Sequence, residues 1–126
     1  LVWLEKAAVD PALGRGRFDA ILEDVFIGHG DDVHKPDWIP EPAHALARDC
    51  LARGGLLVSN TLDEHARVAR SMRRDFESVV AITVEDYDNR VLVAGGAGLT
   101  GAALRARVAA SPVLGGSLPI LGFRTI

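Results

Sequence analysis

The chain has 126 residues, 48% hydrophobic and 25% charged, which suits one modest domain with a single core. The formal net charge of -3 gives no electrostatic reason to expect nucleic acid or an anionic membrane as a partner. No apolar run approaches the roughly 20 residues of a membrane span. The first residues lack the order of a secretory signal, so we expect a cytoplasmic protein. Because the chain does not begin with Met, we expect a fragment or a processed product.

The first clear element is a short apolar run at 20–22, which predicts a buried strand. The residues before it, 1–12, form only a weak helical pattern. Two adjacent carboxylates, Glu23 and Asp24, come directly after the strand, and Phe26 follows them. Ligands bind at the carboxyl ends of strands in open α/β sheets, so this is the first candidate site.

A loop rich in Gly, Asp and His follows this strand. The stretch His29-Gly30-Asp31-Asp32-Val33-His34 collects two imidazoles and two carboxylates, which are possible ligands of a transition metal. Its spacing matches no recognised metal motif, and such loops gather Asp and His for turn geometry. The pattern therefore favours a loop without a metal.

The middle of the chain predicts a helix, a strand and a second helix. Apolar residues recur at helical spacing from 43 to 51, and Gly54-Gly55 is expected to end that helix. The run 56–60 predicts a buried strand, and Thr61-Leu62-Asp63-Glu64 has the form of a capping box that opens the next helix. The expected buried side chains of the two helices are Leu46, Cys50, Leu51, Val68, Met72 and Phe76.

The second of these helices also carries a group of arginines. Such a group most often faces solvent, and a site for phosphate or for an acidic partner is the alternative. The arginines are Arg67, Arg70, Arg73 and Arg74.

The last third of the chain predicts an antiparallel hairpin, 78–85 with 90–94, then a helix at 102–110 and an irregular apolar tail, 111–126. Parallel strands followed by a hairpin predict an α/β fold with an antiparallel edge. The stretch 91–101 also looks like the strand and glycine-rich turn of a nicotinamide dinucleotide site. No Asp or Glu follows it to bind a ribose, so a glycine-eased turn is the favoured interpretation.

The order of elements resembles the second half of a class I S-adenosylmethionine-dependent methyltransferase fold, and within it the spermidine synthase-like proteins. The stretch 18–26, Phe-Asp-Ala-Ile-Leu-Glu-Asp-Val-Phe, is similar to the family's Y/F-D-x-I-x-x-D-A-F strand. The stretch 51–58 is similar to its L-x-P-G-G-x-L-V, and the helix 64–76 and the hairpin strand 89–94 complete the resemblance. It implies a partial Rossmann-like methyltransferase fold in a single, truncated domain, 1–126.

The resemblance implies transfer of a methyl or aminopropyl group from S-adenosylmethionine, or its decarboxylated form, to a small amine. Asp24 matches the aspartate that holds and deprotonates the amine, and Asp10 and Glu23 are the candidates for cofactor binding. If the strand continues, Glu23 points to the opposite face from Asp24, where it has a different role or faces solvent. The candidate walls of the substrate pocket are Phe26, His29 and Trp38.

The family's glycine-rich turn and the strands that precede it have no counterpart before Phe18. The sequence therefore leaves three possibilities open: a truncated enzyme, a domain completed by another chain, or a remnant that no longer binds the cofactor. In the last case the open sheet edge is expected to pair two copies into a homodimer.

Overall fold

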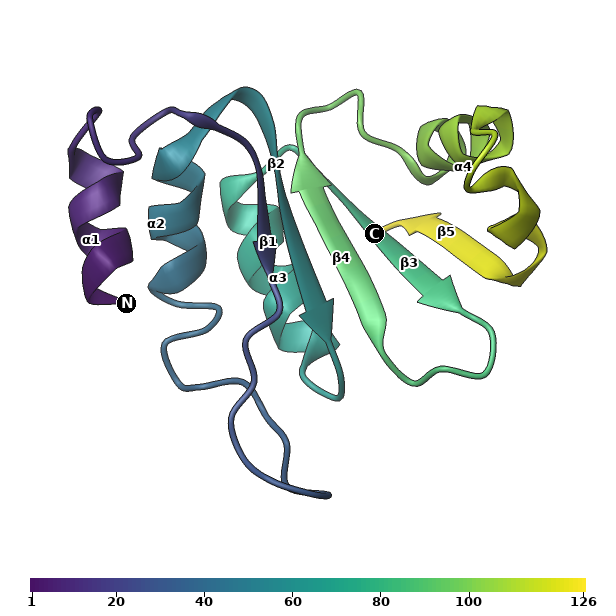
Figure 1. Ribbon diagram of the computed structural model, residues 1–126, viewed down its shortest axis with the longest axis horizontal. Helices are drawn as coiled ribbons and strands as arrows, with labels where there is room; N and C mark the ends of the chain where they lie inside the picture. The colour runs from purple at the N-terminus through teal and green to yellow at the C-terminus, as the bar shows by residue number, and fades with distance from the viewer.

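A five-stranded sheet in the order β1-β2-β4-β3-β5 forms the centre of the computed structural model, which describes residues 1–126 (Figure 1). The strands β1 (Phe18–Glu23) and β2 (Leu51–Thr61) are parallel. The strand β4 (Arg90–Gly95) lies antiparallel between β2 and β3 (Ser78–Val84), and β5 (Leu121–Thr125) pairs antiparallel with β3. Parallel strands closed by an antiparallel hairpin confirm the predicted α/β class.

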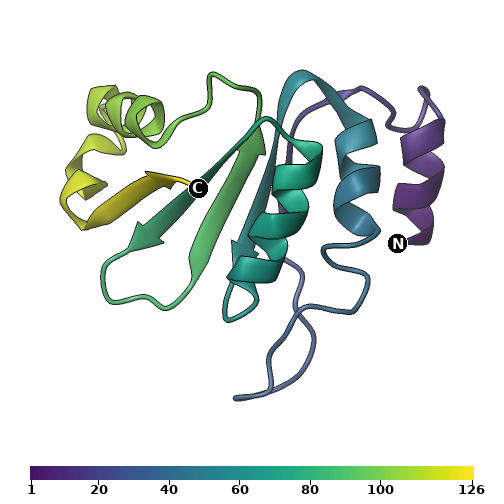
Figure 2. The same cartoon turned by 180° about the vertical axis from the view of Figure 1, so that it is seen from behind.

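Three helices lie side by side on one face of the sheet (Figure 2). They are α1 (Val2–Val9), α2 (Ala43–Cys50) and α3 (His65–Asp75). A fourth helix, α4 (Gly101–Ala110), and the 3₁₀ helix η1 (Gly115–Ile120) lie at the far end, near β5. No helix covers the opposite face of β1 and β2 (Figure 1), and no helix in the molecule is long and apolar enough to cross a membrane.

The hydrophobic core lies between the sheet and the helices α2 and α3. Leu57 on β2 and Leu92 on β4 are fully buried there, beside Val68 and Met72 on α3. The predicted apolar stripe of α3 is thus confirmed, with Phe76 packed against it. Cys50 is fully buried against α1, as expected of a core residue, and burial together with the neighbouring Asp49 charge raises the pKa of its thiol.

The first boundary that the sequence misplaces is the end of α2. The helix stops at Cys50, and β2 begins at Leu51 and continues through the two glycines that were expected to be a stop. Gly54 has φ +81°, which suits an irregular strand, and the β1–β2 register shifts beside it. A Cβ at Gly55 would lie 2.9 Å from the carbonyl oxygen of Phe18, so the glycine lets the two strands meet.

Two further predictions are wrong. The capping box does not form, because the Thr61 hydroxyl donates to the Arg90 carbonyl oxygen (2.7 Å) and Glu64 accepts from the Leu62 N–H (3.1 Å). The tail is not irregular throughout, since it ends in η1 and β5. The strand β5 is held by pairing with β3, about 40 residues earlier in the chain. No local pattern in the apolar, glycine-rich tail therefore predicts it.

Candidate functional site

The Asp24 carboxylate lies at the carboxyl end of β1, on the face that no helix covers. Its Oδ1 accepts a hydrogen bond from Asn60 Nδ2 (3.0 Å), and Asn60 Oδ1 accepts one from Asn89 Nδ2 (2.9 Å). Asp24 is exposed, and its second carboxylate oxygen has no hydrogen-bond partner. The three polar side chains thus line the edge where β1 and β2 end and β4 begins.

The carboxylate of Glu23 points the other way, into a buried polar cluster under α2. Its Oε1 accepts from Lys35 Nζ (2.8 Å) and from the Val25 N–H (2.8 Å), and its Oε2 accepts from Ser59 Oγ (2.6 Å). The Lys35 side chain is fully buried, with Nζ 4.2 Å from the centre of the Phe26 ring. The pair is therefore an internal ion pair with a cation–π contact on one side.

His44 on α2 completes this cluster. Its Nε2 lies 3.7 Å from Glu23 Oε2, and neither ring nitrogen has a hydrogen-bond partner. Burial alone would raise the pKa of Glu23, but the contacts with His44, Lys35, Ser59 and the Val25 N–H outweigh it and lower the pKa to about 2. A carboxylate held this firmly in its charged form is a poor proton acceptor near neutral pH. Glu23 is thus suited to holding the fold rather than to base catalysis.

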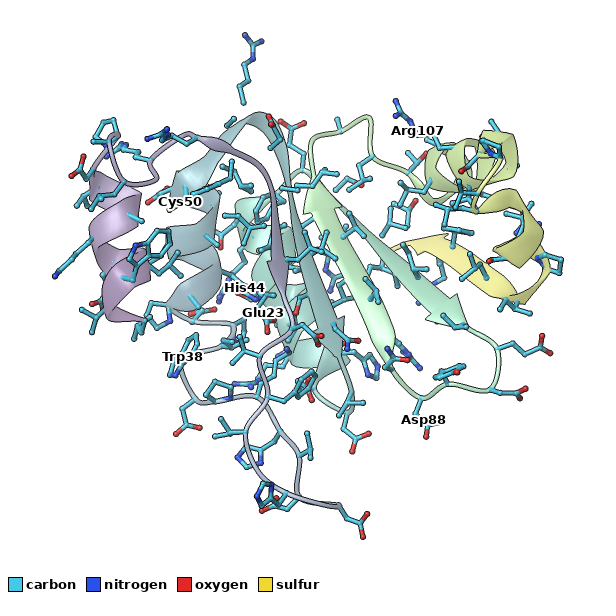
Figure 3. The ribbon with its side chains drawn as sticks, in the orientation of Figure 1. Glu23, Trp38, His44, Cys50, Asp88 and Arg107 are labelled. Atoms are coloured by element: carbon cyan, nitrogen blue, oxygen red, sulfur yellow. The ribbon has the colours of Figure 1, made fainter.

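Trp38 lies on the wall of an apolar pocket that Glu23 and His44 border and that Asp24 does not line. The pocket holds about 260 Å³ and lies between α1, α2 and the end of β1. Figure 3 shows Glu23 and His44 close together, with Trp38 nearby. Its apolar lining is Leu1, Trp3, Leu4, Ile21, Leu22, Val25, Trp38, Ala43, Ala47 and Leu57.

The structure does not bring the remaining predicted residues to Asp24. Asp10 follows α1 and accepts from the Ala12 N–H (2.8 Å), and this end of α1 lies beside the start of β1 rather than its carboxyl end (Figure 1). His29 is exposed in the loop that the Ile27–His34 bridge closes. Phe26 is half-buried under Lys35.

The sequence suggested two other sites, a metal site in the loop 29–34 and a dinucleotide site at 91–101, and the structure bears on both. No three His, Cys, Asp or Glu side chains gather in a way that could hold a metal ion. The glycine-rich turn at 95–101 follows β4, which is antiparallel to both of its neighbours. It therefore does not belong to the parallel strand–helix–strand unit that a dinucleotide site requires. Thr100 instead caps α4, its Oγ1 accepting from the Ala103 N–H (3.1 Å).

The sheet order and the helices on one face define a partial Rossmann-like α/β fold. The solved structure of a probable spermidine synthase from Corynebacterium glutamicum is similar, with a TM-score of 0.59 and 20% sequence identity. The match covers 96% of this chain and 45% of that one, so the chain spans less than half of the solved protein. No protein-family model matches the sequence, and neither does any curated protein. The chain thus has a spermidine synthase-like fold, over part of that domain.

The sequence analysis does not identify three of the residues that surround Glu23, namely Lys35, His44 and Ser59. Lys35 and His44 are 12 and 21 positions from Glu23, and no spacing rule links a loop lysine to a strand-end carboxylate. Ser59 could have been found, because it lies in the predicted strand 56–60 and pairs with Glu23 once the two parallel strands are aligned.

Proposed function

We propose that this chain is the amine-binding part of a spermidine synthase-like domain, which transfers an aminopropyl or methyl group to a small amine. The observation that carries the proposal is the position of Asp24, exposed at the carboxyl end of β1 on the uncovered face, with one oxygen held by Asn60. The likeness to a probable spermidine synthase supports the fold in which such an aspartate has this role.

In this proposal Asp24 has two tasks, to bind the amine and to accept a proton from it. A protonated amine has no lone pair for attack, and a carboxylate within hydrogen-bonding distance can bind the ammonium and then accept its proton. Asn60 fixes one oxygen of Asp24 and leaves the other free for the amine. Because Asn89 in turn holds Asn60, the carboxylate is oriented by a chain of neutral amides that does not neutralise its charge.

The residues present do not make a site for the donor. Neither of the two parallel strands is followed by a glycine-rich turn at a helix N-terminus, since Asp24 follows β1 and Leu62 follows β2, and no helix covers the face that Asp24 occupies. We therefore assign donor binding, whether of S-adenosylmethionine or of its decarboxylated form, to the part of the domain that this chain does not span.

The test is titration with a diamine, 1,4-diaminobutane, followed by two-dimensional NMR of the backbone and of side-chain amides. We expect the Asn60 amide signal to shift with the wild-type chain and to stay fixed in Asp24→Asn. Asp19→Asn, which changes an exposed carboxylate at the other end of β1, is the control and should behave as wild type. Equal shifts in Asp24→Asn and wild type would refute the proposed role. When the donor-binding part is supplied, Asp24→Asn should abolish turnover but leave donor affinity unchanged.

A non-catalytic domain that pairs with a second copy is the other candidate. It is favoured by Leu22, which is 76% exposed on the uncovered face, and by the edge of β1, which pairs with no other strand. Sedimentation equilibrium separates the candidates. A stable dimer with no diamine response would favour the interaction domain, and a monomer that binds the diamine through Asp24 would favour the enzyme part.

A further inference from the structure

A cavity of about 710 Å³ lies between α3 and the strands β4, β3 and β5, away from Asp24. Four arginines line it, and no Asp or Glu side chain does. Arg70 and Arg73 come from α3, Arg90 from the start of β4, and Arg124 from β5. Arginines from three separate elements therefore line one hollow in a chain whose net charge is -3.

The strand register explains how the cavity forms. Arg90 lies opposite Thr83, which lies opposite Gly122, and Arg124 lies opposite Ala81, so these residues share one face of the sheet. This is the face on which α3 packs, and α3 contacts β4 and β3, whereas β5 lies beyond it (Figure 2), so the hollow is open on the side of β5. Gly122 adds no side chain to the base of the cavity, and a Cβ at that position would collide with the Thr83 hydroxyl.

The four arginines have no counter-charge within the molecule. None of them forms an ion pair or a side-chain hydrogen bond, whereas Arg48 pairs with Asp75 (3.0 Å) and Arg74 pairs with Glu41. Arg70 also borders a smaller neighbouring hollow that Asp37 and Glu41 line, yet it pairs with neither. Clustered like charges repel one another, so the cavity favours an anion that relieves this repulsion.

We propose that this cavity binds a small phosphorylated molecule with at least two negative charges. The planar guanidinium fork matches phosphate oxygens in bidentate geometry, and several such groups around one hollow favour a multiply charged anion. The volume falls within the range of small-molecule sites, roughly 300 to 1,000 Å³. Ala81 and Ile126 lie on the same face of the sheet as Arg124 and are partly exposed, and they supply an apolar wall for the organic part of the ligand. The site is separate from Asp24 and does not depend on the function proposed above.

Calorimetric titration of the chain with inorganic pyrophosphate, ADP and adenosine tests the proposal. Pyrophosphate and ADP should bind and adenosine should not, and tighter binding of ADP than of pyrophosphate would indicate that the apolar wall contributes. Arg70→Gln and Arg124→Gln should each weaken ADP binding by about tenfold or more, as expected for loss of a charged hydrogen bond. Arg107→Gln is the matched control, because Arg107 is exposed on α4 and lies outside the cavity (Figure 3).

Three outcomes would overturn the proposal. One is no measurable binding of pyrophosphate or ADP. The second is an equal loss of affinity in Arg107→Gln, which would indicate general charge attraction. The third is tighter binding of a single-stranded oligonucleotide with the same dependence on Arg70 and Arg124, which would identify a nucleic acid surface. Thermal unfolding of each variant shows whether it is folded, and the two cavity variants come from different elements, so misfolding of one does not remove the test.

Discussion

The side chains of Glu23 and Asp24 are consecutive in the chain and lie on opposite faces of the sheet. Their partners on β2, Ser59 and Asn60, are consecutive as well. Since the side chains of a strand alternate between faces, one pair of strand ends supplies a buried carboxylate under α2 and an exposed one on the open face. Burial and hydrogen bonding then separate their roles: Glu23 stabilises the fold, and Asp24 is left accessible.

Replacing Glu23 should destabilise the protein strongly. Glu23→Gln leaves the fully buried Lys35 ammonium without its counter-charge, and breaking a buried pair in this way costs roughly 3 to 5 kcal/mol. Urea unfolding at pH 7 measures the loss. Asp24→Asn is the matched control, because its side chain is exposed, and it should change the free energy of unfolding by less than about 0.5 kcal/mol. Equal losses in the two variants would contradict the division of roles.

The same carboxylate makes stability depend on pH in acid. The pKa of Glu23 is lowered from 4.5 to about 2, so the unfolded chain takes up this proton at a higher pH than the folded one. The resulting stabilisation, about 3 kcal/mol, is fully present above pH 4.5 and is lost as the pH falls toward 2.

Urea unfolding of the wild type and Glu23→Gln between pH 7 and pH 2 checks this dependence. The other carboxylates titrate in both proteins, so the difference between the two isolates Glu23. We expect the difference in free energy of unfolding to shrink steadily below pH 4.5. A difference that stays constant down to pH 2 would show that the charge of Glu23 does not contribute.

The elements predicted best from sequence are those whose pattern is local. The strand through Ile21 and the stripe Val68 and Met72 follow from apolar spacing, and all three pack on the core. The Lys35–Glu23 pair could not be predicted in this way, because lysine is rarely buried and only the turn of the loop between them brings Nζ back to the strand end. The sequence shows that two carboxylates end the strand, but only the folded structure determines that Glu23 is buried and Asp24 is exposed.

Gly28 should be required for that loop. Its φ of +105° is unfavourable for other residues, and a Cβ there would collide with the Asp32 carbonyl oxygen. Gly28→Ala should therefore cost roughly 1 to 3 kcal/mol in thermal unfolding. Gly30→Ala is the control, because its φ of +59° lies in the left-handed region but a Cβ there has open space, so its cost should be clearly smaller. Equal costs would mean that the close contact at Gly28 is relieved by the loop.

The two faces of the sheet should respond differently to the loss of a leucine. Leu57 on β2 is fully buried in the core, so Leu57→Ala should cost about 2 to 5 kcal/mol in urea unfolding. Leu22 on β1 points to the uncovered face and is 76% exposed, so Leu22→Ala should change the free energy by less than about 0.5 kcal/mol. If a second copy covers that face, Leu22→Asp should instead shift a dimer to monomer in sedimentation equilibrium without changing the stability of the monomer. A large loss of monomer stability in Leu22→Ala would show that this face is already packed within the chain.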